Sequence, residues 1–579
     1  MHGNPVNEEV LEVGDGDVEV MDPEMVAAGR KDEVDFMVGK LDMFEWGTLE
    51  DARRRGGKWP TTTKWVEGLK VSDDGEVFVR SRLVGRDYKV KGGREQEDVF
   101  AGMPPLEAKK MLFRRIAADG GWRRRRGLPP EKLLFIDVRK AHLNAVCEEE
   151  EWVELPEEFW QWGRYARLRR WLYGMRPAAA GWEEDYTRRL ESVGFKRGMA
   201  APTVFYNAET GVRVVVHGDD FTFGGTKHEL QKVRELMLGW YEIKDRGMMG
   251  EGPGELKEVV ILGRTLRWKE GGLEYEADTK HVEELIKAQG LDEDSNPAAG
   301  PAIKWKEEDE ALKAEELDSR EEQKAFRASA ARMNYLGLDR PDIQYATKEL
   351  CQGMAAPSRM GQALMKRATR YLIGVPRLVW WFGEVDEEEQ SEEIEVFVDS
   401  DWAGARDRKS TSGGVVLMGG VAVKSWSRTQ KVRALSSGEA EFYAIVSGVA
   451  EGLGMVTLAA DLGWRARVLL WTDSNAGRAI CSRKGLGKLR HLETKWLWVQ
   501  DVVRSGRIRV RKVGGTSNPA DILTKPKSGK DMDGMIRRIG GRLLWRRKGR
   551  SVEDEEGSRM EEIGWTGFQR GHTGSVACQ

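Results

Sequence analysis

The chain has 579 residues, which is enough for about three or four domains of ordinary size. Its formal net charge is −3 although 33% of its residues are charged, so the overall balance neither indicates nor excludes a nucleic-acid partner. No apolar run reaches the roughly 18 residues of a membrane span, and four scattered cysteines suit a reducing compartment, so we expect a soluble intracellular protein.

The hydrophobic periodicity is weak over residues 1–57 and clearer in the residues that follow. Residues 1–57 are acidic and then mixed in charge, and we expect a weakly ordered flanking segment. Over 58–292 short apolar runs alternate with amphipathic segments. Residues 133–137 have the pattern of a buried strand that ends in an acid, and 182–193 carry apolar residues on one helical face.

A tight hairpin is predicted next. Strand-like residues 212–217 and 221–223 flank Gly218-Asp219-Asp220. With Asp137 at the end of its strand, three carboxylates can converge as they do in a polymerase palm. An Asp pair on a turn is weak evidence by itself, because turns favour Asp for reasons unrelated to metals.

The second half of the chain begins with helices. Residues 293–393 are predicted as helical segments, mainly over 325–371, followed by the acidic linker 384–393. The last folded domain is predicted over 394–526. Residues 527–579 are rich in Gly and Arg, and we expect a disordered basic tail.

Four carboxylates mark the last domain. Two end apolar strands, one lies inside a helix and one follows Asn-Pro-Ala: Asp399, Asp473, Glu441 and Asp521. The carboxyl end of a strand is the usual site position in an open α/β sheet. Four such groups in one cleft would repel each other unless divalent cations neutralised them. Two Mg²⁺ ions would do so and would clamp a phosphodiester under attack, so the pattern predicts a two-metal nuclease.

Two local patterns support this arrangement. Residues 413–423 read as a hairpin that turns at two glycines. Ser436 and Glu439 match a capping box, which gives Glu439 a structural role and leaves Glu441 free to face the site. In an alternative that stays open, Asp401 is the metal ligand and Asp399 only caps a turn.

The segments around these acids resemble the ribonuclease H of Ty1/copia-type retrotransposons. They are Phe397-Val-Asp-Ser-Asp-Trp-Ala-Gly404, Arg408-Lys-Ser-Thr-Ser-Gly413, Glu439-Ala-Glu-Phe-Tyr-Ala444, Thr472-Asp-Ser-Asn475 and Ala520-Asp-Ile-Leu-Thr-Lys525. The resemblance implies that the four acids named above hold two Mg²⁺ ions, with Mn²⁺ as a substitute. It also implies that His491 contacts an RNA–DNA hybrid, although a surface role for this histidine is an equal alternative.

Upstream segments resemble the reverse transcriptase of the same elements. They are residues 64–66, 80–84, 135–144, 168–182, 216–220, 241–247 and, at the join to the nuclease, 334–343. The resemblance covers most of the chain, from about residue 58 to 526. It implies an α/β (mixed α+β) fold, with polymerase palm, fingers and thumb followed by a ribonuclease H-like five-stranded mixed sheet that has helices on both faces.

The resemblance also implies roles in the upstream half. Asp137 and Asp219 would hold a second pair of Mg²⁺ ions, with Asp220 adjacent. The implied substrate-binding residues there are Lys64, Arg82, His142, Arg176 and His217. Among them Arg82 and Lys64 would meet the incoming triphosphate, and His142 would stand where the sugar 2′ position is checked.

Three departures from the family pattern weaken the polymerase expectation. His217-Gly218 replace Tyr-Val, His142 replaces an aromatic residue, and Pro177 replaces a Gln. Pro177 removes an amide donor and a side chain that could contact the nucleotide. Two alternatives therefore stay open: a catalytically degenerate nucleic-acid-binding protein, and a protein in which only the nuclease is active.

The leading hypothesis is a retrotransposon reverse transcriptase with ribonuclease H. It would carry out Mg²⁺-dependent DNA synthesis on an RNA or DNA template and cleave RNA in the hybrid. The expected partners are RNA, DNA, RNA–DNA hybrid, deoxynucleoside triphosphates and other element-encoded proteins, with no membrane. The expected location is the cytoplasm, including virus-like particles, with access to the nucleus. Protease, zinc-knuckle and integrase-finger motifs are missing, so we expect the C-terminal part of a polyprotein.

Overall fold

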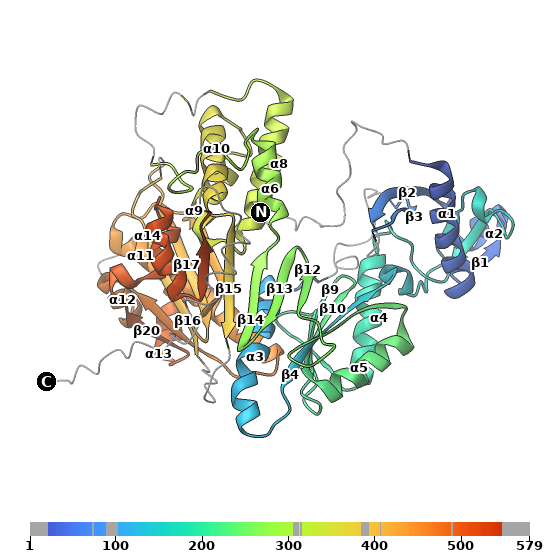
Figure 1. Ribbon diagram of the computed structural model, residues 1–579, viewed down its shortest axis with the longest axis horizontal. Coiled ribbons are helices and arrows are strands. Elements are labelled where there is room, and N and C mark those ends of the chain that lie inside the picture. Colours follow the sequence, from blue (N-terminus) through green and yellow to red (C-terminus); the bar gives the residue numbers. More distant parts are fainter. Residues whose placement is uncertain are drawn as a thin grey trace.

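The computed structural model describes residues 21–71, 75–87, 102–304, 312, 315–383, 393–405, 407–487 and 490–546. Within these ranges the strands form four sheets, of five, six, five and five strands (Figure 1). Helices accompany every sheet. The predicted mixed α/β class is therefore confirmed.

The first sheet, in the order β1-β6-β5-β2-β3, includes part of the segment that was expected to be weakly ordered. Its strands are β1 (Phe44–Gly47), β2 (Thr61–Val71), β3 (Val77–Gly85), β5 (Trp152–Glu154) and β6 (Tyr165–Leu168), and its helices are α1 (Pro23–Val34) and α2 (Leu49–Gly56). Strand β1 pairs with β6, and Met37, Met43 and Phe44 are buried. The prediction of weak order is wrong for residues 21–57, whereas residues 1–20 lie outside the described ranges.

The second sheet is antiparallel, in the order β11-β4-β10-β9-β8-β7. Its strands are β4 (Glu131–Val138), β7 (Lys196–Arg197), β8 (Val204–Tyr206), β9 (Arg213–His217), β10 (Asp220–Thr226) and β11 (Ile243–Met249). The helices are α3 (Leu106–Arg125), α4 (Ala178–Ser192) and α5 (Lys227–Trp240). The predicted strand at 133–137 lies in β4. The predicted helix at 182–193 begins four residues earlier, because three alanines follow Pro177 and extend it.

The third sheet, in the order β12-β13-β14-β15-β21, joins distant parts of the chain. Its strands are β12 (Glu258–Ile261), β13 (Arg264–Lys269), β14 (Gly272–Ala277), β15 (Arg377–Gly383) and β21 (Gly541–Leu544). Its neighbours are α6 (Lys280–Ala288), α8 (Arg320–Gly337), α9 (Pro341–Gln352), α10 (Arg359–Gly374) and α14 (Gly529–Arg538). Because β21 pairs with β15, the prediction of a disordered tail is wrong for residues 527–546; residues 547–579 lie outside the described part of the chain.

The fourth sheet is mixed, in the order β18-β17-β16-β19-β20. Its strands are β16 (Glu393–Ser400), β17 (Thr411–Met418), β18 (Val421–Thr429), β19 (Arg467–Thr472) and β20 (Ile508–Lys512), and its helical elements are α11 (Ser437–Asp461), α12 (Asn475–Ser482), α13 (Trp498–Arg504) and η8 (Pro519–Leu523). The first three strands are antiparallel, and β16, β19 and β20 are parallel. The hairpin predicted at 413–423 is present, since Gly419 and Gly420 both take positive φ angles, of 56° and 79°.

Helix α3 connects three of the four sheets. It packs on β4 and β10 of the second sheet, on β14 and β15 of the third and on β18 of the fourth. Its Arg114 donates hydrogen bonds to the carbonyl oxygens of Gly383 (3.0 Å) and Gly419 (2.9 Å). The end of α11 provides a second link, because the Asp461 carboxylate accepts the amides of residues 199–201 at 2.8 to 2.9 Å. The C-terminal domain is thus docked on the second sheet.

Helix α11 is both long and apolar. An 18-residue window within it has a mean hydropathy of 1.5, and among the described helices it is the one whose length and composition would allow it to cross a membrane. The helix packs against β16, β17 and β19, and 56% of that window is buried. Its small residues Gly448 and Gly452 lie directly against Val398, Leu470 and Val468, where a Cβ would clash. This packing identifies α11 as a core helix of the domain.

Candidate active sites

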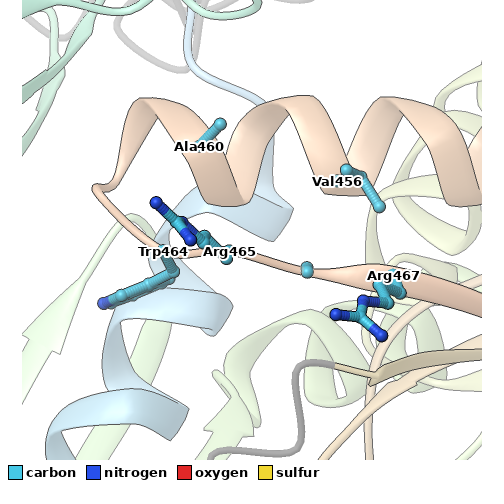
Figure 2. Close-up of a pocket in the computed structure, with 6 residues that line it drawn as sticks. Val456, Ala460, Trp464, Arg465 and Arg467 are labelled. Atoms are coloured by element: carbon cyan, nitrogen blue, oxygen red, sulfur yellow. The ribbon is translucent and has the colours of Figure 1, made fainter.

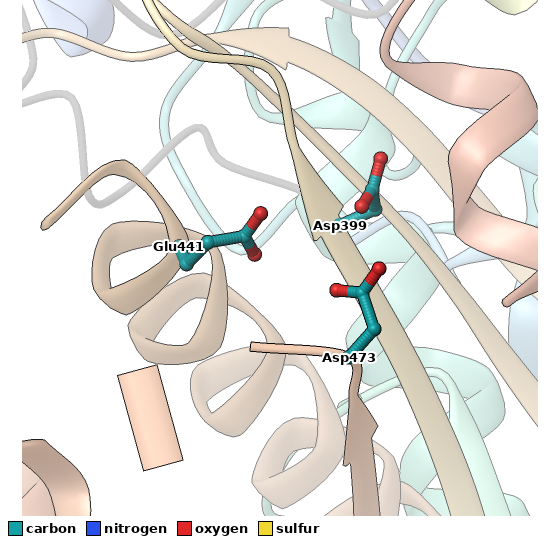
Figure 3. Close-up of side chains that lie close together, drawn as sticks. All are labelled: Asp399, Glu441 and Asp473. Atoms are coloured by element: carbon teal, nitrogen blue, oxygen red, sulfur yellow. The ribbon is translucent and has the colours of Figure 1, made fainter. Parts of the chain in front are cut away.

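Three acids of the C-terminal domain converge at one point (Figure 3). One carboxylate oxygen from each of Asp399, Glu441 and Asp473 lies within 4.8 Å of the other two. Asp399 is near the end of β16, Asp473 follows β19 directly, and Glu441 is in the second turn of α11. Because β16 and β19 are parallel neighbours, their carboxyl ends meet at the same edge of the sheet. The predicted convergence of these three side chains is therefore what the structure has.

Burial and neighbouring negative charge raise the pKa values of Glu441 and Asp399. Burial, followed by the charges of Asp399 and Asp473, raises the pKa of Glu441 to about 9. Burial is also the main reason why the pKa of Asp399 rises to about 6. Oε2 of Glu441 is buried and accepts no hydrogen bond from the described residues. Oxygen ligands in a compact anionic group are what Mg²⁺ or Mn²⁺ prefers, so this donor set fits such an ion.

Neighbouring residues fix the position of Asp399. The Thr524 hydroxyl donates to Oδ2 of Asp399 at 2.6 Å. The side-chain Nδ2 of Asn518 donates to the Val398 carbonyl at 2.9 Å, and its side-chain oxygen caps η8. Element η8 therefore holds β16 on one side of the acid group.

Asp521 and Asp401 lie outside the group of three. Both oxygens of Asp521 form ion pairs, one with Lys525 and the other with Lys527. Asp521 still contributes to the raised pKa of Asp399. Its role as a fourth metal ligand stays a prediction. Asp401 accepts the amide of Thr411, and the geometry favours Asp399 over Asp401 as the ligand on this strand.

The start of α11 differs in one detail from the predicted capping box. The Ser436 hydroxyl accepts the Glu439 amide at 3.2 Å, as predicted. The Glu439 carboxylate does not return to Ser436; it accepts the Leu435 amide (3.0 Å) and the Tyr443 hydroxyl (3.0 Å) and lies 2.9 Å from Nε2 of His491. Glu439 thus has the predicted structural role, but its partners are not those of a capping box. The hybrid contact predicted for His491 stays a prediction.

The upstream acids also gather at strand ends. Asp137 of β4 and Asp220 of β10 are direct cross-strand partners. Asp219 occupies the two-residue turn before β10, where Gly218 takes a φ of 63° at the first central position. The indole of Trp182 donates to the Gly218 carbonyl at 2.8 Å and holds this turn. Among the described residues, however, these acids do not form a group with the 4.8 Å spacing of the C-terminal site.

Two of the predicted substrate-binding residues contact one partly buried tyrosine, Tyr173. The Arg82 guanidinium lies 5.6 Å from the centre of the Tyr173 ring, and His142 meets the same ring edge-on at 5.8 Å. Burial is the main cause of the raised pKa of Tyr173, so its hydroxyl stays protonated. The Tyr173 ring therefore packs against both polar side chains.

The other three predicted substrate-binding residues of this half lie in different settings. Lys64 is exposed on β2, opposite Val84. Arg176 forms an ion pair of 3.4 Å with Asp87. His217 is the cross-strand partner of Asp220, and burial, together with two nearby cations, lowers its pKa to about 4, so the ring is neutral at pH 7. The structure does not bring these three together.

Comparison with known proteins supports the predicted resemblance. A family model described as reverse transcriptase (RNA-dependent DNA polymerase) matches residues 52–254. The chain is 24% identical over 488 residues to a retrovirus-related Pol polyprotein from transposon RE1 of Arabidopsis thaliana, covering 82% of the chain and 31% of that protein. It is 25% identical over 492 residues to the polyprotein from transposon TNT 1-94 of Nicotiana tabacum, covering 83% and 35%. The chain is therefore similar to Ty1/copia-type retrotransposon Pol polyproteins over most of its length.

The chain spans about a third of the length of the curated relatives it matches. Among solved structures it is similar to the foamy viral protease-reverse transcriptase dRH in complex with double-stranded DNA, with a TM-score of 0.45 and 11% identity over 84% of this chain and 69% of that one. The predicted resemblance is confirmed. So is the mixed α/β fold class, in which residues 52–254 match a reverse transcriptase family and a five-stranded mixed sheet follows.

Three residues that contact the predicted acids were not themselves predicted from the sequence. Arg246, Thr524 and Lys527 each contact a predicted acid, and the first two lie inside segments that carry the family resemblance.

No sequence pattern predicted a hollow of about 370 Å³ where α11 ends and β19 begins (Figure 2). It is lined by Val456, Ala460, Trp464, Arg465, Ala466 and Arg467. Because Glu441 is at the opposite end of α11, this hollow is not part of the acid site.

His142→Phe is expected to improve discrimination against ribonucleoside triphosphates by about tenfold, because a larger ring would fill the space next to the sugar 2′ position. The measurement is the ratio of deoxynucleotide to ribonucleotide incorporation in primer extension. His228→Phe, at an exposed histidine of α5, serves as the control. An unchanged ratio for His142→Phe would remove this residue from the nucleotide site.

Proposed function

We propose that the C-terminal domain cleaves the RNA strand of an RNA–DNA hybrid, with Asp399, Glu441 and Asp473 as its metal ligands. The observation that carries the proposal is the convergence of these carboxylates within 4.8 Å, together with one buried oxygen that accepts no hydrogen bond from the residues that the structure describes. Two Mg²⁺ ions bound there would activate the attacking water and stabilise the leaving oxygen.

The protein's own part in cleavage is to position charge. Thr524 holds Asp399 on the strand, while α11 presents Glu441 from the side. Lys525 and Lys527, on the chain after η8, place two cations beside the site through Asp521. Lysine at such a position attracts the phosphates of a nucleic-acid backbone. The arrangement therefore suits an anionic duplex lying across the carboxyl edge of the sheet.

We also infer that the second sheet is a polymerase palm that extends a DNA primer on an RNA or DNA template. The supporting observation is the register of β4 and β10, which sets Asp137 beside Asp220 with Asp219 on the adjoining turn. Arg82 and His142, supported by Tyr173, would face an incoming deoxynucleoside triphosphate. Binding of template and hybrid should fall steeply with salt, because phosphate contacts release counterions.

The two activities can be tested with one pair of variants of the full chain. Asp473→Asn should reduce Mg²⁺-dependent hybrid cleavage by at least about a hundredfold while primer extension on poly(rA)/oligo(dT) continues. Asp219→Asn should do the reverse. Asp501→Asn is the control in the same domain as Asp473, since Asp501 is exposed and pairs with Arg504 on the surface.

The pattern of results separates the alternatives. Cleavage without extension in the unmodified chain would leave only the nuclease. Loss of both activities in Asp219→Asn would contradict two separable sites. Hybrid binding with neither activity would identify a degenerate binding protein.

A further inference from the structure

The proposed palm contains a cation of its own. Arg246 lies on β11, beside β4, and its Nη2 is 2.8 Å from Oδ2 of Asp137 and 3.3 Å from Oδ1 of Asp220. Its Nη1 donates to the Val260 carbonyl at 3.2 Å. The arginine side chain is 29% exposed, and the two carboxylates are 24% and 16% exposed. One guanidinium therefore bridges the two acids in a setting that is largely shielded from water.

A β-bulge aims this side chain. In the pairing of β11 with β4, Asp245 lies opposite Ile136 and Gly247 lies opposite Phe135, so Arg246 is the extra residue. Oδ1 of Asp245 accepts the Gly247 amide at 2.9 Å, and Gly247 takes a φ of 109°, which residues with a side chain rarely adopt. Bulges of this kind redirect side chains next to active sites. The direction of the guanidinium is thus set by the backbone.

The local charge favours the contact. Burial lowers the pKa of Arg246, but its hydrogen bond to Asp137 and the charges of Asp220, Asp137 and Asp219 raise that pKa above the ordinary value. The C-terminal acid group is different, since Oε2 of Glu441 has no hydrogen-bond partner among the described residues. The two acid sites therefore differ in how far the protein neutralises them itself.

We propose that Arg246 is a built-in counter-ion that competes with divalent cations for Asp137 and Asp220. Metal can then load the palm only when the guanidinium moves aside. The proposal rests on the polymerase function proposed above for this sheet. It predicts that the palm binds divalent cations more weakly than the C-terminal acid group, and that the difference lies in one side chain.

The test is Mn²⁺ binding, followed through the paramagnetic resonance signal of the free ion. The full chain carries Asp399→Asn and Glu441→Gln, so that binding at the palm is measured alone. Adding Arg246→Gln should tighten Mn²⁺ binding by about tenfold, because the carboxylates lose a charged hydrogen-bond donor. Arg139→Gln is the matched control, since Arg139 follows β4 but pairs with Glu242. That control should leave Mn²⁺ affinity unchanged.

A second measurement, thermal unfolding, separates a change in Mn²⁺ affinity from a loss of stability caused by Arg246→Gln. In EDTA, Arg246→Gln should unfold at a lower temperature than the parent, because two carboxylates lose their counter-ion. Mn²⁺ should then raise its midpoint more than that of the parent. Unchanged or weaker Mn²⁺ binding by Arg246→Gln, in a chain that still extends primers, would overturn this inference alone. Absence of both palm binding and primer extension would overturn the polymerase function with it.

Discussion

Glu441→Gln is expected to stabilise the metal-free protein at pH 8 and to abolish hybrid cleavage. Burial and the charges of Asp399 and Asp473 raise the pKa of Glu441 to about 9, so its ionised form is unfavourable in the folded state. Glutamine keeps the size of the side chain and removes that charge. We expect the free energy of unfolding at pH 8 to rise by on the order of 2 kcal/mol.

The sign of the pH dependence follows from the direction of this shift. An acid whose pKa is raised on folding holds a proton that the unfolded chain releases. Its contribution to stability is complete below the ordinary value of 4.5 and is lost as the pH rises to about 9. The metal-free parent should therefore lose stability across this range, and Glu441→Gln should lose less. Asp399, whose pKa rises to about 6, gives the remaining slope in the acid part of the range.

Urea unfolding in EDTA at pH 5 and pH 8 measures both effects. Mg²⁺ should restore the parent at pH 8 and should change Glu441→Gln much less. Glu451→Gln is the control on the same helix, because two cations lower the pKa of Glu451 despite its burial, and its loss should destabilise the protein at pH 8. A Glu441→Gln protein that is less stable than the parent at pH 8 without metal would contradict repulsion among the three acids.

The central strands and their acids could be predicted because local pattern and tertiary position agree there. In β4, β16 and β19 an apolar run stops at or beside an acid, and the carboxyl ends of parallel neighbours must lie at one edge of a sheet. The turn at Gly218 was predictable for the same reason, since a two-residue hairpin needs a residue that tolerates positive φ.

Other features depend on partners far away in the sequence. Strand β1 is short and weakly periodic, and it becomes ordered by pairing with β6 more than a hundred residues later. Strand β21 is ordered in the same way by β15. The ion pairs of Asp521 and the aim of Arg246 depend on side-chain reach and on a bulge, which a strand pattern does not encode. The sequence therefore predicted which acids matter better than it predicted their partners.

Asp339→Ala is expected to cause a large loss of stability. The Asp339 carboxylate is buried and joins α3 to the third sheet, since it lies 2.6 Å from Nζ of Lys110 and 2.9 Å from Nε of Arg264. The Tyr275 hydroxyl donates to it at 2.8 Å. Removing the acid leaves two buried cations without their anion, and breaking a buried pair in this way costs about 3 to 5 kcal/mol.

The buried ion pairs of Asp339 should also make the free energy of unfolding depend on pH. Although burial alone raises the pKa of Asp339, the two cations lower it to about 2. An acid with a lowered pKa stabilises the fold above its ordinary value of 3.8, and this contribution is lost as the pH falls to about 2. The stability difference between parent and variant should therefore be constant near neutral pH and should shrink below about pH 4.

Urea unfolding of the full chain tests this expectation, with Asp501→Ala as the control because Asp501 is exposed and its ion pair with Arg504 lies on the surface. Asp339→Asn separates the effect of charge from that of shape. It keeps the side-chain size and should still lose most of the stability, because Lys110 and Arg264 lose their ion pairs with Asp339. If Asp339→Asn were as stable as the parent, Lys110 and Arg264 would have to be neutralised by other groups. Since Lys110 belongs to α3, which packs on the second, third and fourth sheets, the loss should extend to the unfolding of all three.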